Sequence, residues 1–112
     1  MVISKEYYEL LKVGLTDGES KVYLALSELG SNTVGPIVKK SRVAYSNVYD
    51  ILNRLIEKGL VSFVIKSKTK YFQATTPKNL LDYLEKKEKD IISQKEEMKK
   101  ILPDLENLQG SH

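Results

Sequence analysis

The stretch AYSNVYDILNRLIEKGLV, residues 44–61, contains a helix whose two faces differ in kind. Its apolar side chains recur at the spacing of a buried helix stripe, at Val48, Ile51, Leu52, Leu55 and Ile56. The other face carries tyrosines, short polar side chains and an arginine, whereas an ordinary solvent-exposed face carries mostly glutamate and lysine. Gly59 is expected to end the helix. The exposed face therefore has the composition of a binding surface.

The sequence before this stretch predicts three further helices. The first covers residues 3–11, where apolar side chains follow a helical rhythm, at Ile3, Tyr7, Leu10 and Leu11. After Gly14, Thr16 and Glu19 have the spacing of a capping box and open a second helix, which Gly30 ends. Thr33 is the expected N-cap of a short third helix, and a turn over residues 41–43 leads into the quoted stretch.

After Gly59 the apolar period changes from about 3.6 residues to about 2, which indicates strands. The segment LVSFVIKSKTKYFQA, residues 60–74, is typical of a β-hairpin with the polar break KSKTK. Thr76 and Pro77 are expected to open a last helix, roughly 39 Å long if it runs to Leu102, which Pro103 ends or kinks. The predicted fold class is mainly α with a small β-hairpin.

The positive charge of the chain is concentrated in its middle. Residues 39–71 contain eight basic and two acidic residues, a net charge of +6, whereas the whole chain has a net charge of +3. Lysine and arginine placed near phosphates release condensed counterions, so this concentration favours nucleic-acid binding. A solvated basic face without function is the alternative. If the chain binds DNA, we expect these cations to converge on one surface.

The exposed face of the helix over residues 44–58 is the predicted base-reading element. An amide presents a donor beside an acceptor and matches adenine in the major groove, and hydroxyls can reach bases or phosphates. The candidate base-reading residues are Tyr45, Ser46, Asn47 and Tyr49. Two alternatives stay open: in the first, Ser46 and Asn47 only start the helix, and in the second, Tyr49 packs against the hairpin.

Residues 41–61, SRVAYSNVYDILNRLIEKGLV, followed by a Tyr-Phe strand and TTPKNLLDYL, resemble the TrmB family of archaeal transcription regulators. The resemblance spans most of residues 16–84, and its Leu-x-x-x-Gly-Leu-Val part is shared with MarR-like regulators. It implies a winged helix-turn-helix that regulates transcription, with residues 44–58 in the major groove and the wing, residues 66–70, on the backbone or in the minor groove. Family members commonly continue into a sugar-binding domain; nothing after Leu108 supplies one, so an effector stays unknown.

The candidate phosphate-binding residues lie on the helix over residues 44–58, which we call the recognition helix, and in the segments before and after it. They are Thr33, Lys39, Lys40, Arg42, Asn53 and Arg54 together with the wing lysines, Lys66, Lys68 and Lys70. The wing lysines have an alternative role, because cations at a hairpin tip keep it soluble and prevent edge-to-edge strand pairing.

The last helix has an apolar seam suited to a second copy of the chain. Leu84, Ile91, Met98 and Leu105 recur every seven residues, although Lys87 and Gln94 interrupt the seam. We expect a homodimer formed by Tyr7, Leu10, Leu11, Leu84, Ile91, Met98, Ile101, Leu102 and Leu105. The alternative is a single helix that is solvent-exposed or folded back. A dimer would present two recognition helices to a pseudo-palindromic operator, with half-sites roughly 34 Å apart.

The domain organisation follows from these elements. Residues 1–76 are predicted to form the DNA-binding domain and residues 77–109 the dimerisation arm. Residues 110–112, GSH, resemble a vector-derived remnant, and the sequence leaves open whether the natural chain extends beyond residue 109. The protein is expected to be cytoplasmic, since the sequence has no cysteine, no secretory signal and no long apolar run.

Double-stranded DNA is the predicted partner, and no cofactor, metal or membrane is expected. An enzyme is not expected, because the sequence lacks a phosphate-cradling glycine loop, a nucleophile–base set and a metal cluster. The remaining alternative is a winged-helix module that binds another protein through Tyr45 and Tyr49. The net charge of +6 in residues 39–71 favours DNA.

Overall fold

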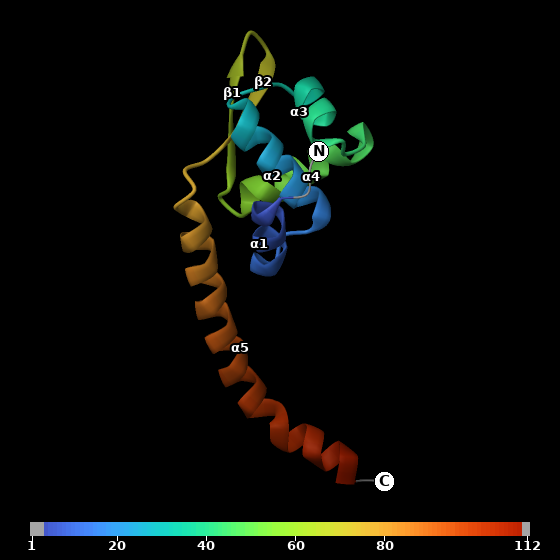
Figure 1. The fold of residues 1–112 in the computed structure, drawn as a ribbon. Coiled ribbons are helices and arrows are strands. Elements are labelled where there is room, and N and C mark those ends of the chain that lie inside the picture. Colours follow the sequence, from blue (N-terminus) through green and yellow to red (C-terminus); the bar gives the residue numbers. More distant parts are fainter. Residues whose placement is uncertain (1–3, 111–112) are drawn as a thin grey trace. The chain divides into compact units, whose positions relative to one another are not determined.

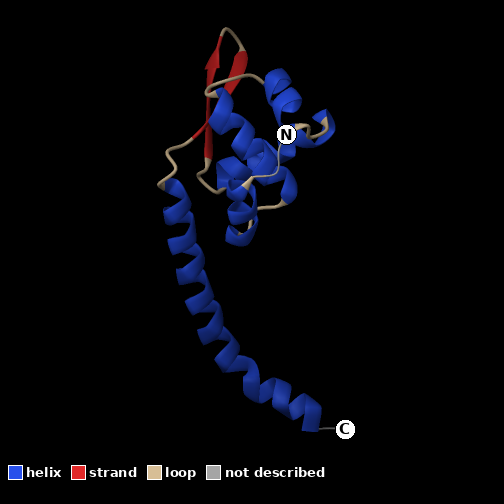
Figure 2. Cartoon of the chain, in the orientation of Figure 1, coloured by secondary structure: helices blue, strands red, loops and turns tan. Residues whose placement is uncertain are grey.

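The computed structural model describes residues 4–110, which form two compact units that divide between Leu80 and Leu81. In chain order the elements are α1 (Lys5–Val13), α2 (Asp17–Leu29), α3 (Val34–Ser41), α4 (Tyr45–Glu57), β1 (Val61–Lys66), β2 (Thr69–Ala74) and α5 (Asn79–Gly110) (Figures 1 and 2). The predicted fold class is confirmed: the described chain is mostly helical, with a two-stranded hairpin and a long last helix.

Local hydrogen bonds explain where the first two helices begin. The backbone N–H of Tyr7 donates to Ser4 Oγ at 3.2 Å, so α1 begins at Lys5, two residues later than predicted. Ile3 lies outside the described residues. The capping box at the start of α2 is confirmed, because the N–H of Glu19 donates to Thr16 Oγ1 at 3.1 Å and the N–H of Thr16 donates to Glu19 Oε1 at 2.8 Å.

The turn between α3 and α4 is closed by a residue in the left-handed region. Arg42 has φ 59°, and its N–H donates to the carbonyl of Val38 at 2.9 Å, which ends α3. The buried Ser41 hydroxyl accepts from the N–H of Val43 at 3.2 Å. This compact turn places the N-terminus of α4 beside α3.

The hairpin is an antiparallel pair with Phe63 opposite Phe72 and Lys66 opposite Thr69. Ser67 and Lys68 form its two-residue turn, with φ 49° and 66°. Type I′ hairpin turns place both central residues in this left-handed region. The free side of β2 is joined to the chain just before α3, since Asn32 and Phe72 exchange backbone hydrogen bonds of 2.8 and 2.7 Å. The hairpin therefore projects beside the start of α3 (Figure 1).

The hydrophobic core of the first unit is built around α2, which contacts α1, α3, α4 and β2. The predicted stripe of α4 supplies Val48, Ile51, Leu52 and Leu55, all buried, while Ile56 is half-buried. Helix α2 adds Val22, Tyr23, Ala25 and Leu26, and the hairpin adds Val61 and Phe72. Burial of one face of α4 leaves its opposite face at the surface.

The last helix begins later than predicted, and at Pro103 it bends rather than ends, which is the second of the two expected outcomes. The backbone N–H groups of Asn79 and Leu80 donate to the carbonyls of Thr76 and Pro77, so a turn precedes α5 and the helix begins at Asn79. Pro103 lies inside α5, which continues to Gly110. Proline removes one backbone hydrogen bond and bends a helix without having to end it, and α5 changes direction in its C-terminal part (Figure 2). Gly110 is therefore helical; residues 111–112 lie outside the described residues.

Candidate nucleic-acid interface

The N-terminal half of α4 presents the predicted base-reading side chains to solvent. Tyr45, Ser46, Asn47 and Tyr49 are all exposed, with buried Val48 between them on the opposite face. Ala44 is the N-cap and provides no side-chain cap bond. Within residues 4–110, the side chains of Ser46 and Asn47 have no hydrogen-bond partner. Their hydroxyl and amide groups therefore keep their full capacity for an external ligand.

Tyr45 and Tyr49 form an exposed aromatic pair. Their ring centroids are 6.0 Å apart and their planes are at 84°, an edge-to-face arrangement. A hydrogen bond with the Tyr45 hydroxyl raises the pKa of Tyr49. The alternative in which Tyr49 is buried against the hairpin is not what the structure shows, because 46% of Tyr49 is exposed.

A shallow groove of about 410 Å³ lies between α4 and the hairpin. We call it the wing groove; it is lined by Thr33, Val34, Gly35, Tyr45, Tyr49, Lys68, Thr69 and Lys70. Thr33 is the N-cap of α3 without a side-chain cap bond. The groove thus combines the start of α3, the tyrosine pair of α4 and the basic tip of the hairpin.

The three wing lysines differ in their surroundings. The ammonium of Lys70 lies 4.6 Å from the ring centroid of Phe63, and that of Lys66 lies 5.9 Å from that of Tyr71. These contacts hold the alkyl chains against the strands while the charges stay at the surface. Lys68 has no such contact among the described residues and is placed by its left-handed backbone at the tip.

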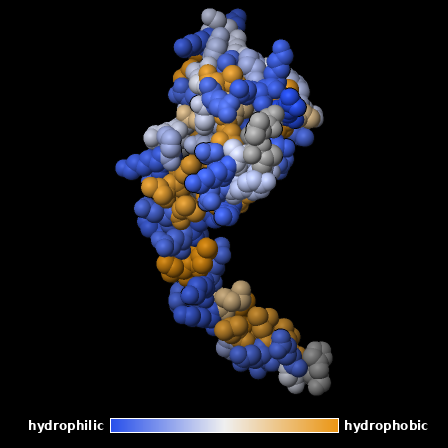
Figure 3. Space-filling view, viewed as in Figure 1, coloured by the Kyte–Doolittle hydropathy of each residue, from blue (hydrophilic) through white to orange (hydrophobic). Residues whose placement is uncertain are grey.

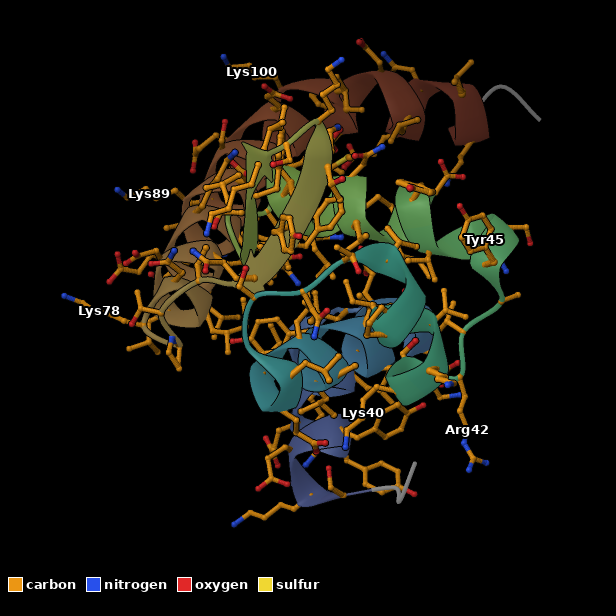
Figure 4. All side chains as sticks on the ribbon, turned by 90° about the horizontal axis from the view of Figure 1, so that it is seen from above. Lys40, Arg42, Tyr45, Lys78, Lys89 and Lys100 are labelled. Carbon is orange, nitrogen blue, oxygen red and sulfur yellow. The ribbon has the colours of Figure 1, made fainter. Side chains whose placement is uncertain are left out.

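The basic residues at the end of α3 lie elsewhere. Lys39, Lys40 and Arg42 line a separate groove of about 740 Å³ with Ser4, Glu6 and Glu28. Lys40 Nζ lies 2.9 Å from Glu28 Oε2, so this cation is already paired. Figure 4 shows Arg42 and Tyr45 pointing outward at the same edge of the domain. The cations of residues 39–71 thus line more than one groove, with Arg42 at two of them, and their convergence on one DNA-binding surface stays a prediction.

Arg54 and Asn53 lie farther along α4, and both are exposed. The Nε atom of Arg54 lies 3.4 Å from Glu19 Oε2, and Lys58 Nζ lies 2.5 Å from the same oxygen. A groove of about 420 Å³ connects this region to the start of α2 and is lined in part by Lys21, Arg42, Asn47, Asp50 and Arg54. Arg54 is therefore shared between a buried carboxylate and the surface.

Glu19 was not predicted to bind these cations. Its side chain is 1% exposed, and burial acts to raise its pKa; hydrogen bonds from Lys58 and Thr16 outweigh burial and lower that pKa overall. The capping-box spacing indicated its bond to Thr16. No local pattern indicated partners 35 and 39 residues away along the chain.

The residues predicted for dimerisation fall into two groups. Tyr7 and Leu10 are buried inside the first unit, and the Tyr7 hydroxyl donates to Asp17 Oδ1, so neither has area to offer a partner; Leu11 is half-buried. The α5 residues all stay exposed, from 39% for Leu84 to 52% for Ile91. Figure 3 shows apolar patches along α5, separated by hydrophilic residues.

Two further properties concern the described residues alone. Between residues 4 and 110, no helix has the length and hydropathy needed to cross a membrane. In the same part of the chain, no three acidic, histidine or cysteine side chains are grouped in a way that would hold a metal ion.

Comparison with known proteins gives matches of two kinds. The profile of the family described as "Sugar-specific transcriptional regulator TrmB" matches residues 10–78. The "HTH-type sugar sensing transcriptional regulator TrmBL1" of Pyrococcus furiosus is 36% identical over 97 residues, covering 87% of this chain and 27% of that protein.

Solved structures extend the likeness. The structure described as "Structure of TrmBL2, an archaeal chromatin protein, shows a novel mode of DNA binding" has a TM-score of 0.76 and 26% identity, covering 92% of this chain and 42% of that one. A MarR family protein from Bacillus stearothermophilus has a TM-score of 0.55 and 22% identity, covering 94% and 81%. The second likeness concerns the fold alone. This chain spans less than half the length of TrmBL1 and of the TrmBL2 chain.

Proposed function

This chain belongs to the TrmB family of sugar-specific transcriptional regulators, and from that membership we propose that it binds double-stranded DNA as a sequence-specific homodimer. The family resemblance found in the sequence is thereby confirmed. In the proposed complex, α4 enters the major groove and the hairpin lies along the backbone or in the minor groove. The name of TrmBL1 describes that protein as sugar-sensing, and we propose no effector for this chain.

One observation carries the proposal: the exposed half of α4 offers unpaired hydroxyl and amide groups next to a groove that ends in basic residues. Ser46 and Asn47 have free side chains on the same exposed face as Tyr45 and Tyr49. Lys68 and Lys70 line the other side of the wing groove. Base edges are read by amide and hydroxyl groups, while lysines neutralise phosphates, so the two sides suit the two parts of a duplex.

The proposed phosphate contacts are graded by the pairing of each cation. Lys39, Arg42, Lys66, Lys68 and Lys70 have no acidic partner among the described residues, and Thr33 offers its hydroxyl and Asn53 its amide at the surface. Lys40 and Arg54 must first leave Glu28 and Glu19, respectively. Surface pairs such as Lys40–Glu28 are worth at most about 1 kcal/mol, so Lys40 can still exchange partners.

The dimer is proposed to form along the exposed apolar seam of α5. Its seven-residue spacing suits a second helix, and a helix with no buried residue in this chain gains stability by pairing. Two α4 helices would then reach half-sites about 34 Å apart.

The test is a selection of bound genomic DNA fragments at two salt concentrations, followed by titration of the selected site and of random DNA. Asn47→Ala is expected to cost about 1–3 kcal/mol on the selected site and almost nothing on random DNA. Ser93→Ala, an exposed polar change on α5, is the control. Equal losses on both DNAs for Asn47→Ala would contradict base reading.

The exposed tyrosine pair also favours a second candidate, a module that binds another protein. The two candidates respond differently to salt. Phosphate contacts make DNA affinity fall steeply with salt, whereas an aromatic protein interface is nearly insensitive to it. Salt-insensitive binding of a protein, with no retention of any DNA fragment, would favour the second candidate.

A further inference from the structure

Glu19 is a buried carboxylate that the proposed DNA contacts do not use. Its side chain is 1% exposed, and one oxygen, Oε1, accepts the N–H of Thr16 at 2.8 Å in the capping box of α2. The other oxygen, Oε2, lies 2.5 Å from Lys58 Nζ and 3.4 Å from Arg54 Nε. Both cations come from the C-terminal end of the recognition helix. One carboxylate therefore joins the start of α2 to the end of α4.

Hydrogen bonds to the residue that follows Lys58 also hold the end of α4. Gly59, which follows the helix with φ 77°, offers its carbonyl to Thr75 Oγ1 at 2.8 Å and to Asn79 Nδ2 at 3.0 Å. The first turn of α2 also packs closely on α4, since a Cβ added at Gly18 would lie 2.6 Å from Ile51 Cδ1. In the N-terminal half of α4, Val48 is buried in the core, but no residue before Ile51 has a hydrogen bond or ion pair with another helix or strand among the described residues. The polar contacts that fix the direction of α4 therefore lie at its C-terminal end.

We propose that Glu19 is a positioning residue for DNA recognition: it fixes the C-terminal half of α4 on α2 and thereby aims Tyr45, Ser46 and Asn47 at the DNA. The inference rests on the proposed function, because it assigns a role within the same interface. The inference removes Arg54 from the proposed phosphate contacts, because Arg54 and Lys58 serve the carboxylate. Phosphate contacts are then left to the wing lysines and to Thr33, Lys39, Lys40, Arg42 and Asn53.

The physical basis is the cost of an unpaired buried charge. A carboxylate removed from water must be compensated by charges and donors nearby, so Glu19 keeps Lys58 and Arg54 in place whether or not DNA is present. A cation held in this way has little freedom to neutralise a phosphate. The rival explanation gives Arg54 and Lys58 to the DNA backbone and leaves Glu19 as an unfavourable negative charge beside it.

The two explanations predict opposite signs for Glu19→Gln. The glutamine oxygen still accepts the N–H of Thr16, but its NH₂ group faces the donors of Lys58 and Arg54. Electrostatics alone predicts tighter DNA binding, because the variant loses one negative charge. Positioning predicts weaker binding of the selected site, by about ten-fold, equivalent to roughly 1.4 kcal/mol. Lys58→Met is expected to weaken binding similarly without changing the salt slope, whereas a lost phosphate contact lowers the slope by about one.

Glu9→Gln provides the matched control. Glu9 is exposed on α1 and pairs with Lys12 at 3.4 Å, so the variant removes the same charge from outside the interface. Its DNA affinity is expected to equal that of the unchanged chain or to be slightly higher. The experiment measures binding of the full chain to the selected duplex at several salt concentrations for Glu19→Gln, Lys58→Met, the double variant and Glu9→Gln.

Amide hydrogen exchange of α4 supplies a readout without DNA. Positioning predicts faster exchange in the C-terminal half of α4 for Glu19→Gln and Lys58→Met, with little further increase in the double variant, while α1 and the hairpin keep their rates. The inference would be overturned if Glu19→Gln bound the selected duplex as tightly as the unchanged chain or more tightly. Unchanged hydrogen exchange in α4 would also overturn it. If the unchanged chain binds no DNA, the proposed function fails, and faster exchange in α4 alone would still support Glu19 as the residue that fixes the helix.

Discussion

Tyr45 meets Tyr49 edge to face on the exposed side of α4, with ring centroids 6.0 Å apart. Tyr45 is 60% exposed, so the pair contributes little to the core and much to the wing groove. We expect Tyr45→Ala to change the free energy of unfolding by less than about 1 kcal/mol, as exposed substitutions usually do. DNA affinity should fall about ten-fold, since the aromatic ring faces the proposed duplex. Chemical denaturation and duplex titration measure the two quantities.

Tyr8 is the matched control for this prediction. It is also an exposed tyrosine, at 56%, and it also meets a second tyrosine, Tyr7, edge to face. Tyr8 lies on α1, away from the wing groove. If Tyr8→Ala weakened DNA binding as much as Tyr45→Ala does, the prediction that Tyr45 contacts the DNA from the wing groove would be refuted.

The elements of the fold were largely predictable because their signals are local. The buried stripe of α4, the capping box of α2 and the change of period after Gly59 each depend on residues close together in the sequence. The end of α5 was not predictable in the same way. Proline weakens a helix at one position, and whether the helix continues depends on the residues after it, which here extend it to Gly110.

The candidate site was predictable as a set of residues on α4 but not as a surface. The cations of residues 39–71 are neighbours in the sequence, yet Lys40 pairs with Glu28, Arg54 with Glu19, and Lys70 lies over Phe63. The net charge of residues 39–71 counts every cation equally, because it contains no information on the partner of each side chain. Tertiary contacts between α2, α3 and α4 divide these cations among separate grooves.

The tip of the hairpin allows stability and DNA binding to be separated. Lys68 has φ 66°, a backbone conformation that costs a residue with a side chain about 1 kcal/mol relative to glycine. Lys68→Gly should therefore raise the free energy of unfolding by about 0.5–1 kcal/mol. It should also lower the slope of log affinity against log salt by about one, because one phosphate contact is lost.

Ser67→Asn tests the same turn without changing the charge. Ser67 has φ 49°, and asparagine tolerates this region better than serine, so stability should again rise. The salt slope of this variant should equal that of the unchanged chain. A lower slope for Ser67→Asn would mean that the geometry of the wing, rather than the charge of Lys68, sets the salt dependence.

Acid should destabilise the first unit through Glu19. Its folded-state pKa is lowered, although burial opposes the shift, because Lys58 and Thr16 bind the charged form more strongly. The stabilisation is fully present above the ordinary glutamate pKa of about 4.3 and is lost as pH falls through the lower folded-state value. Asp17, whose pKa is lowered by the Tyr7 hydroxyl and by Lys21, acts in the same direction.

Urea unfolding between about pH 7 and pH 3 measures this dependence. The free energy of unfolding should fall below about pH 4.3, and Glu19→Gln should have a shallower dependence because one of the linked carboxylates is gone. The remaining slope in that variant belongs in part to Asp17. An identical pH profile for both proteins would show that Glu19 does not titrate differently in the folded and unfolded states.

The apolar seam of α5 can be tested with two adjacent isoleucines. Ile91 belongs to the seven-residue repeat with Leu84, Met98 and Leu105, whereas the positions seven residues on either side of Ile92 are charged, Glu85 and Lys99. Both side chains are similarly exposed in one chain, at 52% and 58%. In a dimer along the seam, Ile91→Glu would bury a charge at the interface, while Ile92→Glu would leave it in water. Ile91→Glu should therefore sediment as a monomer at micromolar concentration, and Ile92→Glu as a dimer.

Dissociation of the dimer should also weaken binding to a duplex with two half-sites far more than binding to a single half-site, since linked sites gain from effective concentration. Equal effects of the two substitutions on sedimentation would mean that the seven-residue repeat does not form the interface.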